Sequence, residues 1–78
     1  MPKAIINNRV RQLRFEHGEM TQQNLADQIG CARQTVIMLE QGRYVPSLAL
    51  ALRTAQVFDL PVEDIFTLKA TDRNTDTE

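Results

Sequence analysis

The sequence predicts a small all-α domain, and three observations carry this prediction. Apolar residues recur at intervals of three and four along most of the chain, which is the spacing of helices with one buried face. A glycine or proline follows the periodic segments and ends them. With 78 residues, the chain can build one hydrophobic core and no second domain. We therefore expect a compact five-helix domain.

The first predicted helix occupies residues 8–17. Val10 and Leu13 form its apolar side. Asn7 or Asn8 can cap its start, because a short polar side chain accepts a hydrogen bond from an unpaired backbone N–H of the first turn. The segment stops at a His-Gly pair, and glycine is a common helix terminator.

Two further short helices follow and are joined by a tight turn. The first starts after Thr21 and ends at Gly30, and the second begins near Ala32 and ends at Gly42. Their apolar positions at helical spacing are Leu25, Ala26, Ile29, Val36 and Leu39. We expect Gly30 to adopt the left-handed conformation of the turn, which glycine takes at no steric cost.

A fourth helix is predicted after Ser47, which stands where a helix cap belongs. Its apolar residues at intervals of three and four are Leu48, Ala51, Leu52, Ala55 and Phe58. After Pro61, residues 62–66 can form a brief fifth helix with acidic residues near its start, where the helix dipole favours them.

The chain ends are the least regular parts. Residues 3–6 and 66–69 are compatible with a pair of short strands, although we favour irregular structure. The expected organisation is an N-terminal segment 1–7, a domain 8–66 and a polar, frayed tail 67–78, which has too few apolar residues to offset its ordering entropy.

Composition excludes several classes of protein. Cys31 is the only cysteine, so it cannot form an intramolecular disulfide. His17 is the only histidine, and one cysteine with one histidine is too few ligands for a typical zinc site. We interpret Cys31 as a small apolar filler and expect no metal or other cofactor. No apolar run approaches the roughly 20 residues of a membrane span, and no secretion signal is visible, so we expect a cytoplasmic protein. No catalytic constellation appears, which argues against an enzyme.

Charge is distributed unevenly along the chain. Residues 1–53 contain seven Lys or Arg against four Asp or Glu, whereas residues 54–78 contain two against six. This asymmetry is compatible with polyanion binding by the first part, and equally with two solvated surfaces.

The stretch 22–41, two short helices around a tight turn, resembles the helix-turn-helix domain of phage repressors and Cro proteins, the XRE-like family. The resemblance spans about residues 8–66. The matching residues are Val10, Arg11, Gln12, Leu13 and Arg14, then Thr21, Gln22, Leu25 and Ala26, then Gln34, Thr35, Val36, Leu39, Glu40 and Gly42, and finally Pro46, Ser47, Leu48, Ile65 and Phe66. It implies a transcriptional regulator, which we expect to be a repressor, whose helix 32–41 enters the major groove of double-stranded DNA.

The resemblance also implies roles for individual residues. The positions that read bases are Ala32, Arg33, Gln34 and Met38. The positions that bind phosphates are Gln22, Thr35, Gln41 and Arg43. Arg14 and Glu40 match a structural ion pair between the first helix and the base-reading helix. Each exposed Arg or Gln can also be a plain solvated side chain.

Three questions stay open on the sequence. Glu19 is one extra residue in a loop, which we expect to be absorbed locally. Ile37 and Met38 put apolar residues where the family often has polar ones, which keeps a protein-binding or antitoxin-like subunit as the alternative function. We predict a homodimer, because specific operators are usually recognised by two-fold dimers. Its surface lies around the last two helices, at Leu50, Val57, Leu60 and Val62, or at the terminal residues Ile5, Ile6 and Leu68, although these residues can equally just cover the core.

Overall fold

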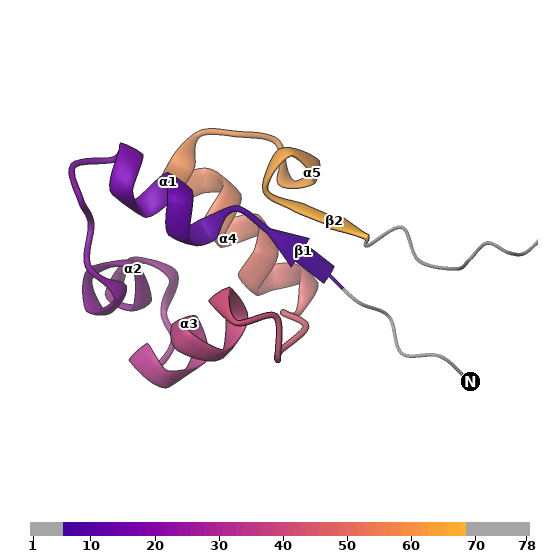
Figure 1. Ribbon diagram of the computed structural model, residues 1–78, viewed down its shortest axis with the longest axis horizontal. Coiled ribbons are helices and arrows are strands. Elements are labelled where there is room, and N and C mark those ends of the chain that lie inside the picture. Colours follow the sequence, from indigo (N-terminus) through magenta and orange to yellow (C-terminus); the bar gives the residue numbers. More distant parts are fainter. Residues whose placement is uncertain (1–5, 69–78) are drawn as a thin grey trace, which may run out of the picture.

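The computed structural model describes residues 6–68, which form five helices and one two-stranded sheet (Figure 1). The helices are α1 (Val10–Glu16), α2 (Gln22–Ile29), α3 (Arg33–Glu40), α4 (Leu48–Phe58) and α5 (Val62–Ile65), and the strands are β1 (Ile6–Asn8) and β2 (Phe66–Leu68). The predicted five-helix class is confirmed. In Figure 1, α3 lies at the lower edge of the domain, and α1 and α5 lie along the upper edge.

The start of α1 differs from the prediction. Arg9 is its N-cap residue and makes no side-chain cap bond. Asn8 cannot occupy that position, because its backbone is extended and paired with Phe66 in the sheet. The Oδ1 atom of Asn8 nevertheless accepts a hydrogen bond from the backbone N–H of Val10, at 3.1 Å. The predicted Asn cap is therefore wrong by one residue, while the acceptor that it was expected to supply is present.

The loop after α1 accommodates the extra residue locally. Gly18 and Glu19 both have left-handed backbone angles, with φ of +76° and +57°. The backbone N–H of Glu19 then bonds to the carbonyl of Phe15, and that of Met20 to the carbonyl of Arg14. The chain thus reverses direction tightly against the end of α1.

The ends of α2 follow the prediction closely. Thr21 is the N-cap residue, and its side chain accepts a hydrogen bond from the backbone N–H of Asn24 at 2.9 Å. Gly30 is left-handed, as predicted, with φ of +76°. The backbone N–H groups of Gly30 and Cys31 both bond to the carbonyl of Ala26, which closes the turn that leads into α3.

One core joins all five helices. Its buried hydrophobic members are Val10, Leu13, Leu25, Ala26, Ile29, Val36, Leu39, Leu50, Ala55, Phe58 and Ile65. Ser47 caps α4 as predicted, because its Oγ accepts from the backbone N–H of Leu50 at 3.1 Å. The face that α4 buries is rotated from the expected one: Leu50 and Thr54 point inward, whereas Leu48 and Leu52 remain exposed.

The two strands correct the prediction for the chain ends. β1 and β2 are antiparallel, with Ile6 opposite Leu68 and Asn8 opposite Phe66. Irregular structure was therefore the wrong choice for residue 6 and for residues 66–68. The sheet forms because α5 returns the chain to the start of α1, where the N–H of Arg9 bonds to the carbonyl of Ile65. The expectations for residues 1–5 and 69–78 lie outside the described residues.

Candidate nucleic-acid interface

The inner face of α3 is anchored in the core. Val36 is 0 % exposed and Leu39 is 1 % exposed, and both contact the core cluster. The eight residues of α3 make about two turns, so these two anchors fix one side of the helix along its whole length. The opposite side of α3 consequently faces outward.

An ion pair holds the last turn of α3 against α1. Arg14 Nε lies 2.6 Å from Glu40 Oε2, and Arg14 Nη2 donates to Glu40 Oε1 at 3.1 Å. The two side chains are only 8 % and 7 % exposed. Arg14 also donates through Nη1 to the carbonyl of Met20 at 2.7 Å. This guanidinium therefore joins α1, the loop before α2 and the end of α3.

Gln22 completes the same network, which sequence reasoning did not anticipate. Its side-chain Nε2 donates to Glu40 Oε1 at 3.1 Å, from the first residue of α2. The carboxylate of Glu40 thus accepts from α1 and from α2 at once. An amide nitrogen carries two N–H groups, so one of those on Gln22 remains available beyond this bond.

Asn8 supplies a second link to the end of α3. Its Nδ2 donates to the backbone carbonyl of Leu39 at 2.8 Å, across 31 residues of sequence. The carbonyls in the last turn of a helix have no partner inside the helix, so this bond satisfies one of them. The sequence marked Asn8 only as a helix cap, and nothing in its neighbourhood indicates this distant partner.

The predicted base-reading residues are not equally placed. Ala32, Arg33 and Gln34 are exposed at the start of α3, whereas Met38 is half-buried. Within residues 6–68, no hydrogen bond or ion pair joins the side chains of Arg33 or Gln34 to another residue. These two polar side chains are therefore available to an external partner.

The start of α3 differs from the starts of α2 and α4. Ala32 is the N-cap residue of α3, and no side chain accepts from the first-turn N–H groups. Thr21 and Ser47 supply such an acceptor in the other two helices. Unpaired N–H groups and the positive end of the helix dipole favour an anionic group at this end.

The predicted phosphate-binding residues border the outer face of α3. Thr35 is half-buried in the first turn. Gln41 and Arg43 are exposed just beyond the last turn, where Gly42 is left-handed and the N–H of Arg43 bonds to the carbonyl of Met38. With Gln22 at the start of α2, these residues lie at both ends of α3.

The apolar residues on α3 are less prominent than the sequence implied. Ile37 and Met38 are both half-buried, so each side chain contacts the protein over part of its surface.

Cys31 is a free, half-buried thiol that packs against the core, and burial raises the pKa of this thiol. A raised pKa disfavours the reactive thiolate, which fits the interpretation of Cys31 as a filler.

Two other features are absent from residues 6–68. No group of three or more His, Cys, Asp or Glu side chains there is arranged to hold a metal ion. No helix in this range is both long and apolar enough to span a membrane.

Comparisons with known proteins agree with this geometry. Residues 10–65 match the sequence profile of a helix-turn-helix family. Among similar proteins, an uncharacterized HTH-type transcriptional regulator of Archaeoglobus fulgidus is 44 % identical over 61 residues, covering 78 % of this chain and 86 % of the relative. The uncharacterized HTH-type transcriptional regulator YgzD of Bacillus subtilis is 42 % identical over 64 residues, covering 82 % and 96 %. A further regulator of this type, from Methanothermobacter thermautotrophicus, is 50 % identical over 60 residues, covering 76 % and 86 %.

The fold itself has a solved counterpart. A solved structure titled "Crystal structure of a putative DNA-binding protein from Bacteroides fragilis" superimposes with a TM-score of 0.70, and the match covers 81 % of this chain and all of the other. At 21 % identity, this likeness shows the common fold alone.

Proposed function

The chain belongs to the helix-turn-helix family of DNA-binding transcriptional regulators, and on this premise we propose that it reads a specific double-stranded DNA sequence by placing α3 in the major groove. The observation that carries the proposal is the contrast within α3. Its inner face is fixed by Val36, Leu39 and Glu40, while Arg33 and Gln34 extend outward without an internal partner. A rigid helix with available polar side chains at its start suits direct reading of base edges.

Each base-reading residue has a specific chemical role in this proposal. The guanidinium of Arg33 matches the O6 and N7 acceptors of guanine, and the amide of Gln34 matches N7 and N6 of adenine. Ala32 and the exposed part of Met38 contact thymine methyl groups. Two hydrogen-bonding readers and two apolar readers give a recognition surface of a few base pairs.

Phosphate contacts hold the helix in register. Gln22 has a second amide N–H beyond the one that bonds to Glu40, and it lies at the positive end of α2. Thr35, Gln41 and Arg43 supply further donors at the two ends of α3. Because Glu40 holds both Arg14 and Gln22, the phosphate-binding amide is positioned by the same carboxylate that fixes α3.

We further propose that the chain acts as a repressor and as a homodimer on an inverted repeat, without a catalytic step. One domain of this size covers one half-site, and two half-sites about 34 Å apart fit two copies related by a two-fold axis. Bound in this way, the protein would block access to the DNA that it covers.

The decisive experiment is selection from a randomised duplex pool, followed by sequencing of the bound DNA. We expect the natural chain to enrich an inverted repeat, and the double variant Arg33→Ala, Gln34→Ala to lose that enrichment. Glu63→Ala and Asp64→Ala, exposed on α5, serve as control substitutions and should leave the motif unchanged. No enrichment by the natural chain even at low salt, where phosphate contacts are strongest, would contradict the proposal and favour the protein-binding alternative.

A further inference from the structure

We propose that Asn8 is a positioning residue for DNA recognition, because its side chain fixes the angle at which α3 presents Arg33 and Gln34. The inference rests on the proposed function and deepens it, since it names a residue outside the helix-turn-helix segment on which the choice of DNA sequence depends. Asn8 lies in β1 and acts through the backbone of α3, without touching the DNA itself.

The side chain of Asn8 bridges two helices. Its Oδ1 accepts from the backbone N–H of Val10 at 3.1 Å, at the start of α1. Its Nδ2 donates to the backbone carbonyl of Leu39 at 2.8 Å, in the last turn of α3. Both ends of the amide are therefore engaged, which fixes its orientation. The residue is half-buried, so water competes less with these bonds than it would on an open surface.

The backbone of Asn8 is itself held in place. In β1 it lies opposite Phe66 of β2, and Figure 1 shows β1 between β2 and α3. The next residue, Arg9, donates through its backbone N–H to the carbonyl of Ile65 at 3.0 Å and through Nη1 to the carbonyl of Asp64 at 3.1 Å. The bond to α3 consequently starts from a point that both α5 and β2 fix.

The bond from Asn8 differs in kind from the ion pair at the end of α3. Arg14 and Gln22 reach α3 through the carboxylate of Glu40, which can rotate about its own side-chain torsions. Asn8 instead bonds to the main chain of α3, at the carbonyl of Leu39. Among residues 6–68, no other side chain donates to the α3 backbone. This bond therefore restrains the axis of the helix directly.

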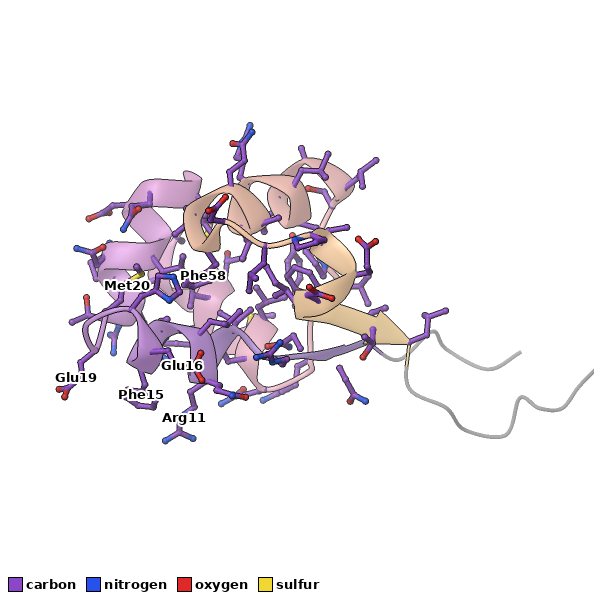
Figure 2. All side chains as sticks on the ribbon, turned by 90° about the horizontal axis from the view of Figure 1, so that it is seen from above. Arg11, Phe15, Glu16, Glu19, Met20 and Phe58 are labelled. Carbon is purple, nitrogen blue, oxygen red and sulfur yellow. The ribbon has the colours of Figure 1, made fainter. Side chains whose placement is uncertain are left out.

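The outer side of α1 supplies no comparable link. Figure 2 shows Arg11, Phe15 and Glu16 projecting outward from this helix. The guanidinium carbon of Arg11 lies 5.7 Å from the centre of the Phe15 ring, and Glu16 accepts from Gln12 at 2.9 Å. Within the described residues, none of these four side chains is hydrogen-bonded to α3. The junction of α1 with α3 thus depends on the bridge at the start of α1 and on the buried ion pair.

The distance between the bridge and the reading residues makes small rotations important. Leu39 and Arg33 are six residues apart, which is about 9 Å along the helix axis. A tilt of about 10° at the bridge would displace the first turn of α3 by about 1.5 Å. Hydrogen bonds to base edges tolerate only a few tenths of an ångström around a length of about 2.9 Å, so such a tilt breaks them.

Loss of the bridge should therefore reduce sequence preference more than overall DNA binding. Phosphate contacts identify no base, and they act partly through charge, whose attraction falls off slowly with distance. A residue that contributed to stability alone would have no such selective effect. A fully folded variant of that kind would bind selected and random duplexes as the natural chain does.

Gel-shift titrations on the duplex selected from the randomised pool and on a random duplex measure this preference, at a temperature where every variant is folded. Asn8→Asp keeps the acceptor for Val10 and loses the donor to Leu39. Asn7→Asp is the matched control, because Asn7 is the exposed neighbour in β1 and the substitution adds the same charge. We expect the ratio of the two affinities to fall about tenfold in Asn8→Asp, equivalent to the loss of one base contact, and to stay unchanged in Asn7→Asp.

Ile65→Val controls for stability. It removes one methyl group from a buried core residue of α5 and should destabilise the fold about as much as Asn8→Asp. Its sequence preference should equal that of the natural chain. The proposal is overturned if the affinity ratio of Asn8→Asp equals that of Asn7→Asp, or if Ile65→Val lowers the ratio as much.

Backbone amide chemical shifts provide a readout that needs no DNA. In Asn8→Asp, we expect the amide signals of Arg33, Gln34 and Thr35 to move by more than they do in Asn7→Asp. Changes confined to the surroundings of residue 8 and to the last turn of α3 would overturn the proposal. If the natural chain prefers no DNA sequence, the proposed function fails, and the amide shifts still decide whether Asn8 positions α3.

Discussion

The two faces of α3 differ in almost every interaction that they make. The inner face has two fully buried apolar residues and a carboxylate that accepts hydrogen bonds from two other helices. The outer face begins at an uncapped end and carries Arg33 and Gln34, which have no internal partner among residues 6–68. In this one short helix, the residues that fix its orientation are therefore different from those that are free to contact DNA. A substitution on α3 should accordingly change either the stability of the fold or DNA binding.

The largest expected effect comes from the inner face, at the ion pair. Arg14→Ala should lower the free energy of unfolding by about 3–5 kcal/mol, because it leaves the buried carboxylate of Glu40 without its main partner. Urea denaturation measures this loss. The double variant Arg14→Met, Glu40→Leu removes both charges and should lose less. Equal losses in the single and double variants would show that packing, and not the uncompensated charge, decides stability here.

The outer face should show the opposite behaviour. Arg33→Ala should weaken specific DNA binding by about 1–3 kcal/mol and change the free energy of unfolding by less than about 0.5 kcal/mol. Gel-shift titration and urea denaturation on the same preparation separate the two quantities. If Arg33→Ala unfolds more easily but binds DNA as before, Arg33 stabilises the fold and does not read bases.

A smaller effect is expected where the sheet meets α3. Asn8→Asp keeps an oxygen for the N–H of Val10 but loses the donor to the carbonyl of Leu39, which should cost about 0.5–1.5 kcal/mol of stability. Asn8→Ala removes both bonds and should cost more. If Asn8→Asp is as stable in urea as the natural chain, the link to Leu39 contributes nothing, whereas equal stability of the two variants would mean that the bond to Val10 contributes nothing.

The smallest effect should be a gain in stability. Ala32→Ser supplies the missing acceptor at the start of α3 and should raise the free energy of unfolding by about 0.5–1 kcal/mol. The midpoint of urea unfolding gives the answer. An unchanged midpoint would indicate that the first-turn N–H groups of α3 are already satisfied by solvent.

The sequence predicted the helices well because their signals are local. Thr21, Ser47 and Gly30 act within one turn of their own positions, and their caps and left-handed angle are as expected. The pairing of β1 with β2 was missed because its partners are about sixty residues apart and each strand has only three residues.

The candidate site divides in the same way. The resemblance to phage repressors placed Arg33 and Gln34 on an outward surface and Arg14 near Glu40, and the structure has both arrangements. It did not anticipate the bond from Gln22 to Glu40, nor the reach of Asn8 to Leu39. These contacts depend on how α1, α2 and α3 are oriented, which no short stretch of sequence encodes.

By itself, the sequence determined the helical class, most of the helix ends and the family. Helical periodicity, caps and glycines act over a few neighbouring residues, and the family follows from the residues that match its motif. Only the tertiary structure decided which of the periodic leucines of α4 are buried. Leu50 and Leu52 have the same chemistry and lie on the same helix, yet one completes the core and the other is half exposed. The reason is physical: helical spacing defines an apolar side only to within the width of a side chain, and packing against α2 and α5 selects the residues that face inward.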